Sequence, residues 1–341
     1  MSKSQSFLAF PCTLHKTTRF LGALAVTCSL ALFSQSASAV TVFSDTFNAG
    51  STLNAAPTAP TATSTSYEFG AGNTSGAFSS INPGDLSLAL GNTTTVLGEI
   101  EARFGASPVT LATIGDFIDL QITWVATSNV FSGAATTATQ VALGLYNSGG
   151  SNPQQGTVLY NSTTSPTGGA KSWEGYAGNA FQGSNSIVFA RPQQTSATSA
   201  QNQELLFNAA SGSQAYNSPQ GGQLTGASKA TTISETQGST NTSEFRITLT
   251  GVSSLAVSNM MYNGAGTGGT IVFAENGTTN GVSDFTFDGL AFGYRFSGTQ
   301  SNSAIDVQSI TITTNVPEPS TFALAGAGLG IMLMMIRRRR S

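Results

Sequence analysis

The sequence predicts an all-β sandwich over residues 40–315, with an apolar segment near each end of the chain. Short runs in which apolar and polar residues alternate predict strands with one buried face. The central region contains no apolar stripe with the period of an amphipathic helix. It is also rich in Ser, Thr, Gly, Asn and Ala and poor in charge, which suits strands joined by long polar loops.

Alternation identifies the strands in chain order. The predicted strands are residues 117–125, 141–146, 245–250, 285–287, 290–296 and 305–312. In the first of these, Ile118 and Trp124 lie on the apolar face and Asp119 lies on the polar face. Asp288-Gly289 is a tight-turn dipeptide, so we expect a hairpin between the strands that flank it. An apolar sheet face must be covered by another sheet, and a sandwich follows.

Two stretches are predicted to be loops because they contain too few apolar residues to pack. Residues 56–66 are rich in Pro, Thr and Ala, and residues 193–240 are rich in Gln, Ser, Thr and Gly. Residues 204–207, Glu-Leu-Leu-Phe, interrupt the second stretch as a candidate strand.

Residues 1–39 have the zones of a secretory signal peptide. Basic residues precede an apolar run at 20–33, which is too short to span a bilayer comfortably. The small residues Ala37 and Ala39 suit a signal peptidase, so we expect cleavage between Ala39 and Val40. The alternative is a buried N-terminal helix.

That cleavage would remove Cys12, His15 and Cys28, which are the chain's complete set of Cys and His. A disulfide framework, a Ser-His-Asp triad, a Cys nucleophile and a zinc site with His or Cys ligands are then excluded. Residues 40–315 hold six Lys and Arg against fifteen Asp and Glu, a net charge of −9. This balance argues against binding to nucleic acid or to anionic lipid.

Residues 316–341 form a tail with three parts. The first part is Val316, Pro317, Glu318 and Pro319, continuing to Ser320. Proline fixes φ and disfavours helix in the preceding residue, so this part is an extended break. Residues 321–336 are apolar and, as a transmembrane helix, would span about 24 Å against a hydrocarbon core of about 30 Å. The third part is Arg337, Arg338, Arg339 and Arg340, whose charge favours the cytoplasmic side.

This combination of Pro-Glu-Pro, short apolar segment and terminal arginines resembles the PEP-CTERM sorting domain. The resemblance implies that exosortase, a membrane protease, releases the protein near Pro317–Pro319 to the cell surface or the extracellular matrix. Proteins with this tail come from Gram-negative bacteria, many of which make exopolysaccharide. The expected partners are therefore signal peptidase, exosortase and extracellular polysaccharide, with membrane contact through the tail. A tail that stays in the membrane as an anchor is the alternative.

The order of the central strands resembles a concanavalin-like jelly roll. The segments that carry the resemblance are residues 115–124, 141–150, 172–181, 287–296 and 304–313. An immunoglobulin-like sandwich and a β-solenoid are alternatives, although no repeat of fixed period supports the solenoid.

Glu99 and Glu101 would share one face of a strand, and retaining glycosidases use carboxyl pairs about 5 Å apart. Jelly-roll glucanases carry an E-x-D-x-x-E pattern, but Phe104 stands where its final acid would fall. We therefore expect two solvated carboxylates and predict no catalytic residue.

Trp173, Glu174 and Tyr176 are the candidate glycan-binding residues, because aromatic rings stack on sugars and carboxylates bind hydroxyl groups. The alternative is that both aromatic residues belong to the core or to a sheet edge. Oxygen ligands of the kind that Ca²⁺ takes are also present, but their spacing does not match an EF-hand loop. They are Asp284, Asp288, Glu275 and Asn276. No cofactor or metal site is predicted.

The sequence therefore predicts an exported, non-enzymatic surface or matrix protein associated with exopolysaccharide. A carbohydrate-binding, lectin-like domain is one alternative, and a glycoside hydrolase or polysaccharide lyase is another.

Overall fold

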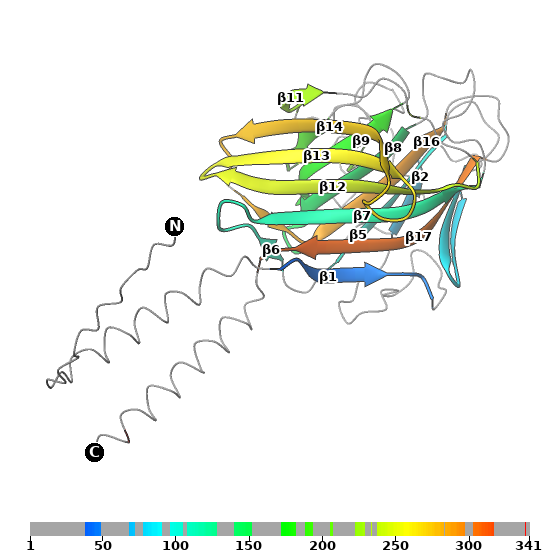
Figure 1. The fold of residues 1–341 in the computed structure, drawn as a ribbon, viewed down its shortest axis with the longest axis horizontal. Helices are drawn as coiled ribbons and strands as arrows, with labels where there is room; N and C mark the ends of the chain where they lie inside the picture. Colours follow the sequence, from blue (N-terminus) through cyan, green and yellow to red (C-terminus); the bar gives the residue numbers. More distant parts are fainter. Residues whose placement is uncertain are drawn as a thin grey trace, which may run out of the picture. The chain divides into compact units, whose positions relative to one another are not determined.

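Two antiparallel sheets face each other in the part of the chain that the structure describes (Figure 1). The structure is a computed structural model, and the chain divides into two compact units, Met1–Ser38 and Ala39–Ser341. The described residues are 38–48, 68–71, 78–90, 96–104, 108–127, 140–151, 172–181, 188–193, 205–206, 222–228, 233, 237–282, 284–296, 303–316 and 338. The predicted signal segment up to residue 37, the predicted loop at 56–66 and the predicted helix at 321–336 lie outside them.

The larger sheet has nine strands in the order β11-β14-β13-β12-β7-β17-β4-β3, with β1 also paired to β17. Its strands are β1 (Val40–Asp45), β3 (Phe78–Asn82), β4 (Asp85–Leu90), β7 (Phe117–Ala126), β11 (Thr225–Ser228), β12 (Thr240–Gly251), β13 (Ser254–Asn263), β14 (Thr270–Asn280) and β17 (Ser303–Thr314).

The smaller sheet has six strands in the order β10-β9-β8-β16-β5-β2, and a separate pair joins β15 to β6. These strands are β2 (Glu68–Ala71), β5 (Val96–Arg103), β6 (Val109–Thr110), β8 (Gln140–Asn147), β9 (Glu174–Phe181), β10 (Val188–Arg191), β15 (Thr286–Phe287) and β16 (Gly289–Phe296).

The predicted alternation in β7 is confirmed. Ile118 and Trp124 are fully buried between the sheets, where they meet residues such as Phe292 of β16. The chain crosses repeatedly from one sheet to the other, and its first and last strands, β1 and β17, lie side by side. The prediction of an all-β sandwich of jelly-roll type is therefore confirmed.

The hairpin predicted at Asp288-Gly289 is wrong. β15, before this dipeptide, pairs with β6, whereas β16, after it, pairs with β5 and β8. Asp288 is buried and bound by side chains from other strands, which outweighs the turn preference of its dipeptide.

A second apolar cluster covers the outer face of the six-stranded sheet. Leu205 and Leu206 are fully buried there against Tyr146 and Phe189. The prediction of a strand at 204–207 is wrong for these two residues, which form a bend and pack onto the sheet instead of joining it. The predicted loop at 193–240 also contains the short strand β11.

Both ends of the sandwich domain lie at the same end of the nine-stranded sheet. Val40, which begins β1, is opposite Thr314, which ends β17. Beyond β17, the Asn315 side chain accepts a hydrogen bond from the Phe117 backbone nitrogen at 2.7 Å. Val316 still packs against the core. The domain therefore continues up to the residue that precedes Pro317.

Within the described residues, no helix has the length and hydrophobicity needed to cross a membrane.

Candidate functional site

A cavity of about 470 Å³ opens where β9 and β15 begin and β8 and β14 end. The polar and charged residues that line it are Asn147, Glu174, Tyr176, Arg191, Thr279, Asn280, Asp284 and Thr286. They come from three distant parts of the sequence and from both sheets. The structure thus brings together two of the three candidate glycan-binding residues, Glu174 and Tyr176.

Two carboxyl groups, Glu174 and Asp284, face each other in this cavity. Burial and the nearby charge of Asp284 raise the pKa of Glu174 above its ordinary value. The Asn147 amide donates a hydrogen bond to one Asp284 oxygen, and the Thr286 backbone nitrogen donates to the other at 2.9 Å. Asp284 is thereby held in place, while the half-buried Glu174 remains open to a ligand.

Tyr176 offers a phenol group and little ring surface. It is buried between the sheets and belongs to the main core. Burial, followed by the charges of Glu174 and Asp284, raises the pKa of Tyr176 to about 12. The phenol therefore stays protonated at neutral pH and can donate a hydrogen bond.

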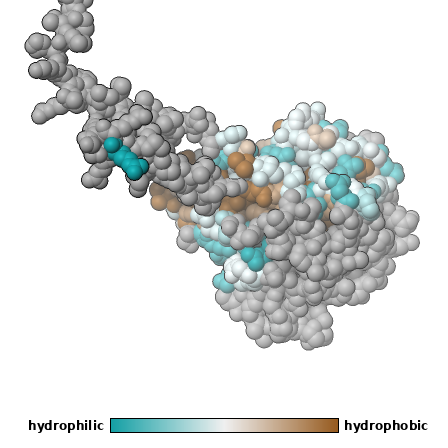
Figure 2. Space-filling model, turned by 90° about the horizontal axis from the view of Figure 1, so that it is seen from below, coloured by the Kyte–Doolittle hydropathy of each residue, from teal (hydrophilic) through white to brown (hydrophobic). Residues whose placement is uncertain are grey.

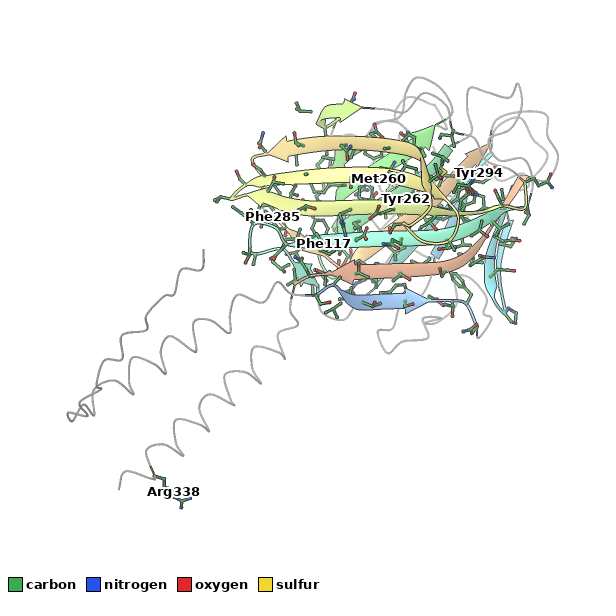
Figure 3. The ribbon with its side chains drawn as sticks, viewed as in Figure 1. Phe117, Met260, Tyr262, Phe285, Tyr294 and Arg338 are labelled. Atoms are coloured by element: carbon green, nitrogen blue, oxygen red, sulfur yellow. The ribbon has the colours of Figure 1, made fainter. Side chains whose placement is uncertain are left out.

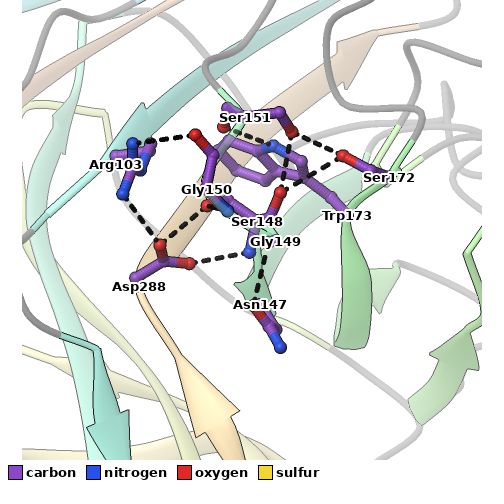
Figure 4. Close-up of polar contacts among 9 residues, drawn as sticks. All are labelled: Arg103, Asn147, Ser148, Gly149, Gly150, Ser151, Ser172, Trp173 and Asp288. Carbon is purple, nitrogen blue, oxygen red and sulfur yellow. Dashed lines mark hydrogen bonds and ion pairs between the residues drawn. The ribbon is translucent and has the colours of Figure 1, made fainter.

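An ion pair between the partly exposed Arg103 and the buried Asp288 supports the loop beside the cavity (Figure 4). Arg103 Nη2 lies 3.2 Å from Asp288 Oδ2. Asp288 also accepts hydrogen bonds of 2.7 Å from the backbone nitrogen and the hydroxyl of Ser148. Arg103 donates a further hydrogen bond to the Gly150 carbonyl oxygen at 3.3 Å. These bonds fix the turn after β8 and so position Asn147 at the cavity.

Trp173 lies in the second apolar cluster and does not line the cavity. Its indole nitrogen donates to the Ser151 carbonyl oxygen at 3.1 Å, which ties β9 to the turn after β8 (Figure 4). Its ring passes so close to Gly289 that a Cβ there would lie 2.6 Å from the ring. The Arg191 guanidinium donates to the Trp173 carbonyl oxygen.

Glu99 and Glu101 share the outer face of β5, as predicted, because Ile100 and Ala102 between and beside them point into the core. The expectation that they are solvated is wrong, since both are buried. Oε1 of Glu99 accepts a hydrogen bond from the Leu205 backbone nitrogen, and burial raises the pKa of Glu99 to about 8. The apolar cluster that contains Leu205 therefore seals this carboxyl pair.

A third set of carboxyl groups lies on the outer face of the nine-stranded sheet, where Tyr262 of β13 is labelled in Figure 3. The Tyr262 hydroxyl donates to Glu244 at 2.6 Å. Burial, followed by the charge of Glu244, raises the pKa of Asp119 to about 7. Arg246 lies 3.6 Å from Asp119, and its guanidinium stacks 4.2 Å from the centre of the Phe117 ring.

The four candidate calcium ligands do not form one site. Asp284 is in the cavity, Asp288 is in the ion pair with Arg103, and Glu275 is buried between the sheets, while Asn276 points outward. Among the described residues, no group of three or more His, Cys, Asp and Glu side chains is arranged to hold a metal ion.

Sequence reasoning found Glu174 and Tyr176 but not their partner Asn147, and it considered Asp284 only as a calcium ligand. The available signal was weak: each is a polar residue next to the end of a predicted strand. The sequence separation of 137 positions between Asn147 and Asp284 explains why local patterns did not pair them.

Comparison with known proteins gives one decisive match, and it lies in the tail. Residues 315–340 match the family model of the PEP-CTERM protein-sorting motif. This motif implies that the protein is exported, anchored in the membrane and processed by exosortase. The tail's resemblance to PEP-CTERM is therefore confirmed. No curated protein matches the sequence.

Several solved structures are similar to the sandwich domain. A seed lectin of Lotus tetragonolobus is 12% identical with a TM-score of 0.40, over 82% of this chain and 100% of the lectin. Lectin I of Ulex europaeus, solved with the methyl glycoside of α-L-fucose, is 11% identical with a TM-score of 0.40, over 81% and 98%. An endo-1,3-β-glucanase of Streptomyces sioyaensis is 14% identical with a TM-score of 0.39, over 82% and 97%.

Proposed function

We propose that this chain is a surface or matrix protein whose sandwich domain binds exopolysaccharide without catalysis, after signal peptidase and exosortase have processed its two ends. The observation that carries the proposal is the open cavity at Glu174. There, hydrogen-bonding side chains from both sheets converge on a space that a ligand can enter.

The chemistry of this cavity suits a sugar. Its volume of about 470 Å³ falls within the range of small-molecule sites, about 300 to 1,000 Å³. Glu174 and Asn280 offer acceptor oxygens for hydroxyl groups, and the Tyr176 phenol and Asn280 amide offer donors. Hydrogen bonds to an ionised carboxylate are the stronger kind.

Charge favours neutral or amine-bearing sugars over acidic ones. Two carboxyl groups, Glu174 and Asp284, line the cavity against one arginine, Arg191, and the domain has a net charge of −9 over residues 40–315. Each arginine side chain that the structure describes in the sandwich has a partner within the domain, although Arg191 also lines the cavity. Their partners are Asp288 for Arg103, the Trp173 carbonyl for Arg191 and Asp119 for Arg246.

Hydrolase or lyase activity is the weaker alternative for this domain. The carboxyl pair that suggested it, Glu99 and Glu101, lies beneath Leu205 and Leu206, where a polysaccharide has no access. A hydrolytic acid and nucleophile must both reach the glycosidic bond. The burial of this pair therefore removes the observation that suggested hydrolysis.

The binding test uses columns of immobilised neutral, amine-bearing and acidic polysaccharides. We expect retention on the first two, and loss of retention for Glu174→Ala and Tyr176→Phe. Asp85→Asn, which removes a carboxyl group far from the cavity, is the matched control and should leave retention unchanged. Circular dichroism confirms that each variant is folded. Equal retention of all folded variants would refute binding in this cavity.

The cellular localisation of the protein is tested separately by cell fractionation. We expect the surface or extracellular form to lack Arg337–Arg340. Full-length protein that stays in the inner membrane with these arginines attached would contradict release by exosortase.

A further inference from the structure

The end of the sandwich from which the tail leaves carries exposed apolar side chains. Ile114 is 64% exposed and Val252 is 92% exposed. Ile114 precedes β7, and Val252 is at the tip of the β12–β13 hairpin, so both lie at the end marked by the pairs Val40–Thr314 and Gly251–Ser254. Figure 2 shows hydrophobic surface, in brown, toward the left-hand end of the described part of the domain.

The loop that presents Ile114 is held by specific hydrogen bonds. The Asp116 carboxylate accepts hydrogen bonds of 2.8 Å from the backbone nitrogens of Ala112 and Thr113. The Gly115 nitrogen donates to the Leu249 carbonyl oxygen at 2.8 Å, and Gly115 has φ near +97°, which suits glycine. A single exposed apolar residue is ordinary on a protein surface. Here, hydrogen bonds hold the loop that presents the exposed Ile114 in a fixed conformation.

The same loop is tied to the start of the tail. The Asn315 side chain donates a hydrogen bond to the Gly115 carbonyl oxygen at 3.1 Å. Val316 follows and packs on the core, and Pro317 comes next in the sequence. Ile114 is therefore linked, through one asparagine, to the point where the chain leaves the domain.

The tether between the domain and the apolar segment is short. Five residue steps separate Val316 from Thr321, and a fully extended chain covers about 3.3 Å per residue, or roughly 17 Å in all. The interfacial layer of a bilayer accounts for about 5 to 7 Å of this on each side of the hydrocarbon core. A tail inserted at Thr321 thus holds this end of the sandwich at the bilayer surface.

We propose that, before exosortase acts, this end rests on the bilayer, with Ile114 and Val252 in the lipid interface. We choose lipid as the binding partner of this surface because the tail enters the membrane next to it. The domain's net charge of −9 argues against attraction to anionic lipid, so the contact is apolar and works on zwitterionic lipid. This proposal rests on the sorting part of the proposed function and leaves sugar binding aside.

The test places one fluorescent label at a time on the exported chain that keeps its tail. Cys12→Ser and Cys28→Ser ensure that any copy with its signal segment still attached has no native thiol, and I114C, V252C or I271C supplies a site for an environment-sensitive dye. Ile271 is the matched control because it is 54% exposed but lies at the opposite end, where Thr270 pairs with Asn263. The chain is purified from cells without exosortase and reconstituted in phosphatidylcholine vesicles that contain nitroxide-labelled lipid.

We expect a blue-shifted emission and at least a twofold stronger quenching at positions 114 and 252 than at position 271, with little dependence on salt. Equal quenching at all three positions, or none at 114 and 252, would overturn the proposal. A parallel assay with exosortase keeps the two proposals apart. Tail removal without lipid contact at 114 and 252 would overturn this inference alone, whereas an intact tail would count against the sorting step.

Discussion

The Leu205 backbone nitrogen lies 3.1 Å from Oε1 of Glu99. This hydrogen bond anchors a buried leucine pair over a carboxyl group that an open sheet face would leave in water. Glu99, a candidate active-site acid from its sequence, is therefore a buried group. Burial is the largest cause that raises its pKa to about 8.

Glu99→Gln should stabilise the protein at high pH. The folded pKa of about 8 lies above the ordinary value of 4.5, so the folded state holds the proton more tightly. The resulting stability is complete below pH 4.5 and is lost as the pH rises through 8. Urea unfolding should show the variant to be more stable at pH 9, by on the order of 3 kcal/mol, and equal to the native chain at pH 4. Identical pH profiles would contradict a proton on Glu99.

Asp119→Asn should reduce the pH dependence of the free energy of unfolding at lower pH than Glu99→Gln does. Burial and Glu244 raise the pKa of Asp119 from 3.8 to about 7. The stability from its protonation is therefore present below pH 3.8 and declines up to about pH 7. We expect the variant to gain on the order of 2 kcal/mol over the native chain at pH 8. Asp85→Asn serves as the control, and an equal gain there would assign the effect to net charge instead.

Asp288→Ala should destabilise the domain and weaken sugar binding together. The substitution leaves Arg103 and Ser148 without their shared acceptor. Each buried donor that is left without an acceptor costs about 1 to 3 kcal/mol. We expect thermal unfolding at a temperature lower by roughly 10 °C, with reduced retention on the polysaccharide column. If retention stays intact while stability falls, the ion pair does not position Asn147.

Gly289→Ala should be destabilising although alanine is small. The added Cβ would lie 2.6 Å from the Trp173 ring, which is fully buried and tied to Ser151. Overpacking of this kind costs about 1 to 3 kcal/mol. The double variant with Trp173→Phe should recover part of the loss in a double-mutant cycle. Purely additive effects would show that the ring and Gly289 are not in contact.

Local patterns predicted those strands whose buried face is uniformly apolar. β7 is the clearest example, because Ile118 and Trp124 repeat with a period of two on one face. β13 was missed since Asn259 interrupts its apolar face, where it packs against Gly178 of the other sheet. The turn predicted at Asp288 failed because its partner, Arg103, lies 185 residues away. Only part of the cavity lining could be predicted from the sequence, because its residues also come from distant positions in the chain.

The cavity and the tail share one end of the sandwich. Val282, which lines the cavity, donates its backbone nitrogen to the Ser253 carbonyl oxygen, next to Val252. Under the proposed arrangement, a chain whose tail is still in the membrane turns its sugar site toward lipid. Proteolysis would then both free the protein and unmask its binding site. A newly exported copy that is still in the membrane would then not bind polysaccharide. It would therefore not cross-link the membrane to the extracellular matrix before its release.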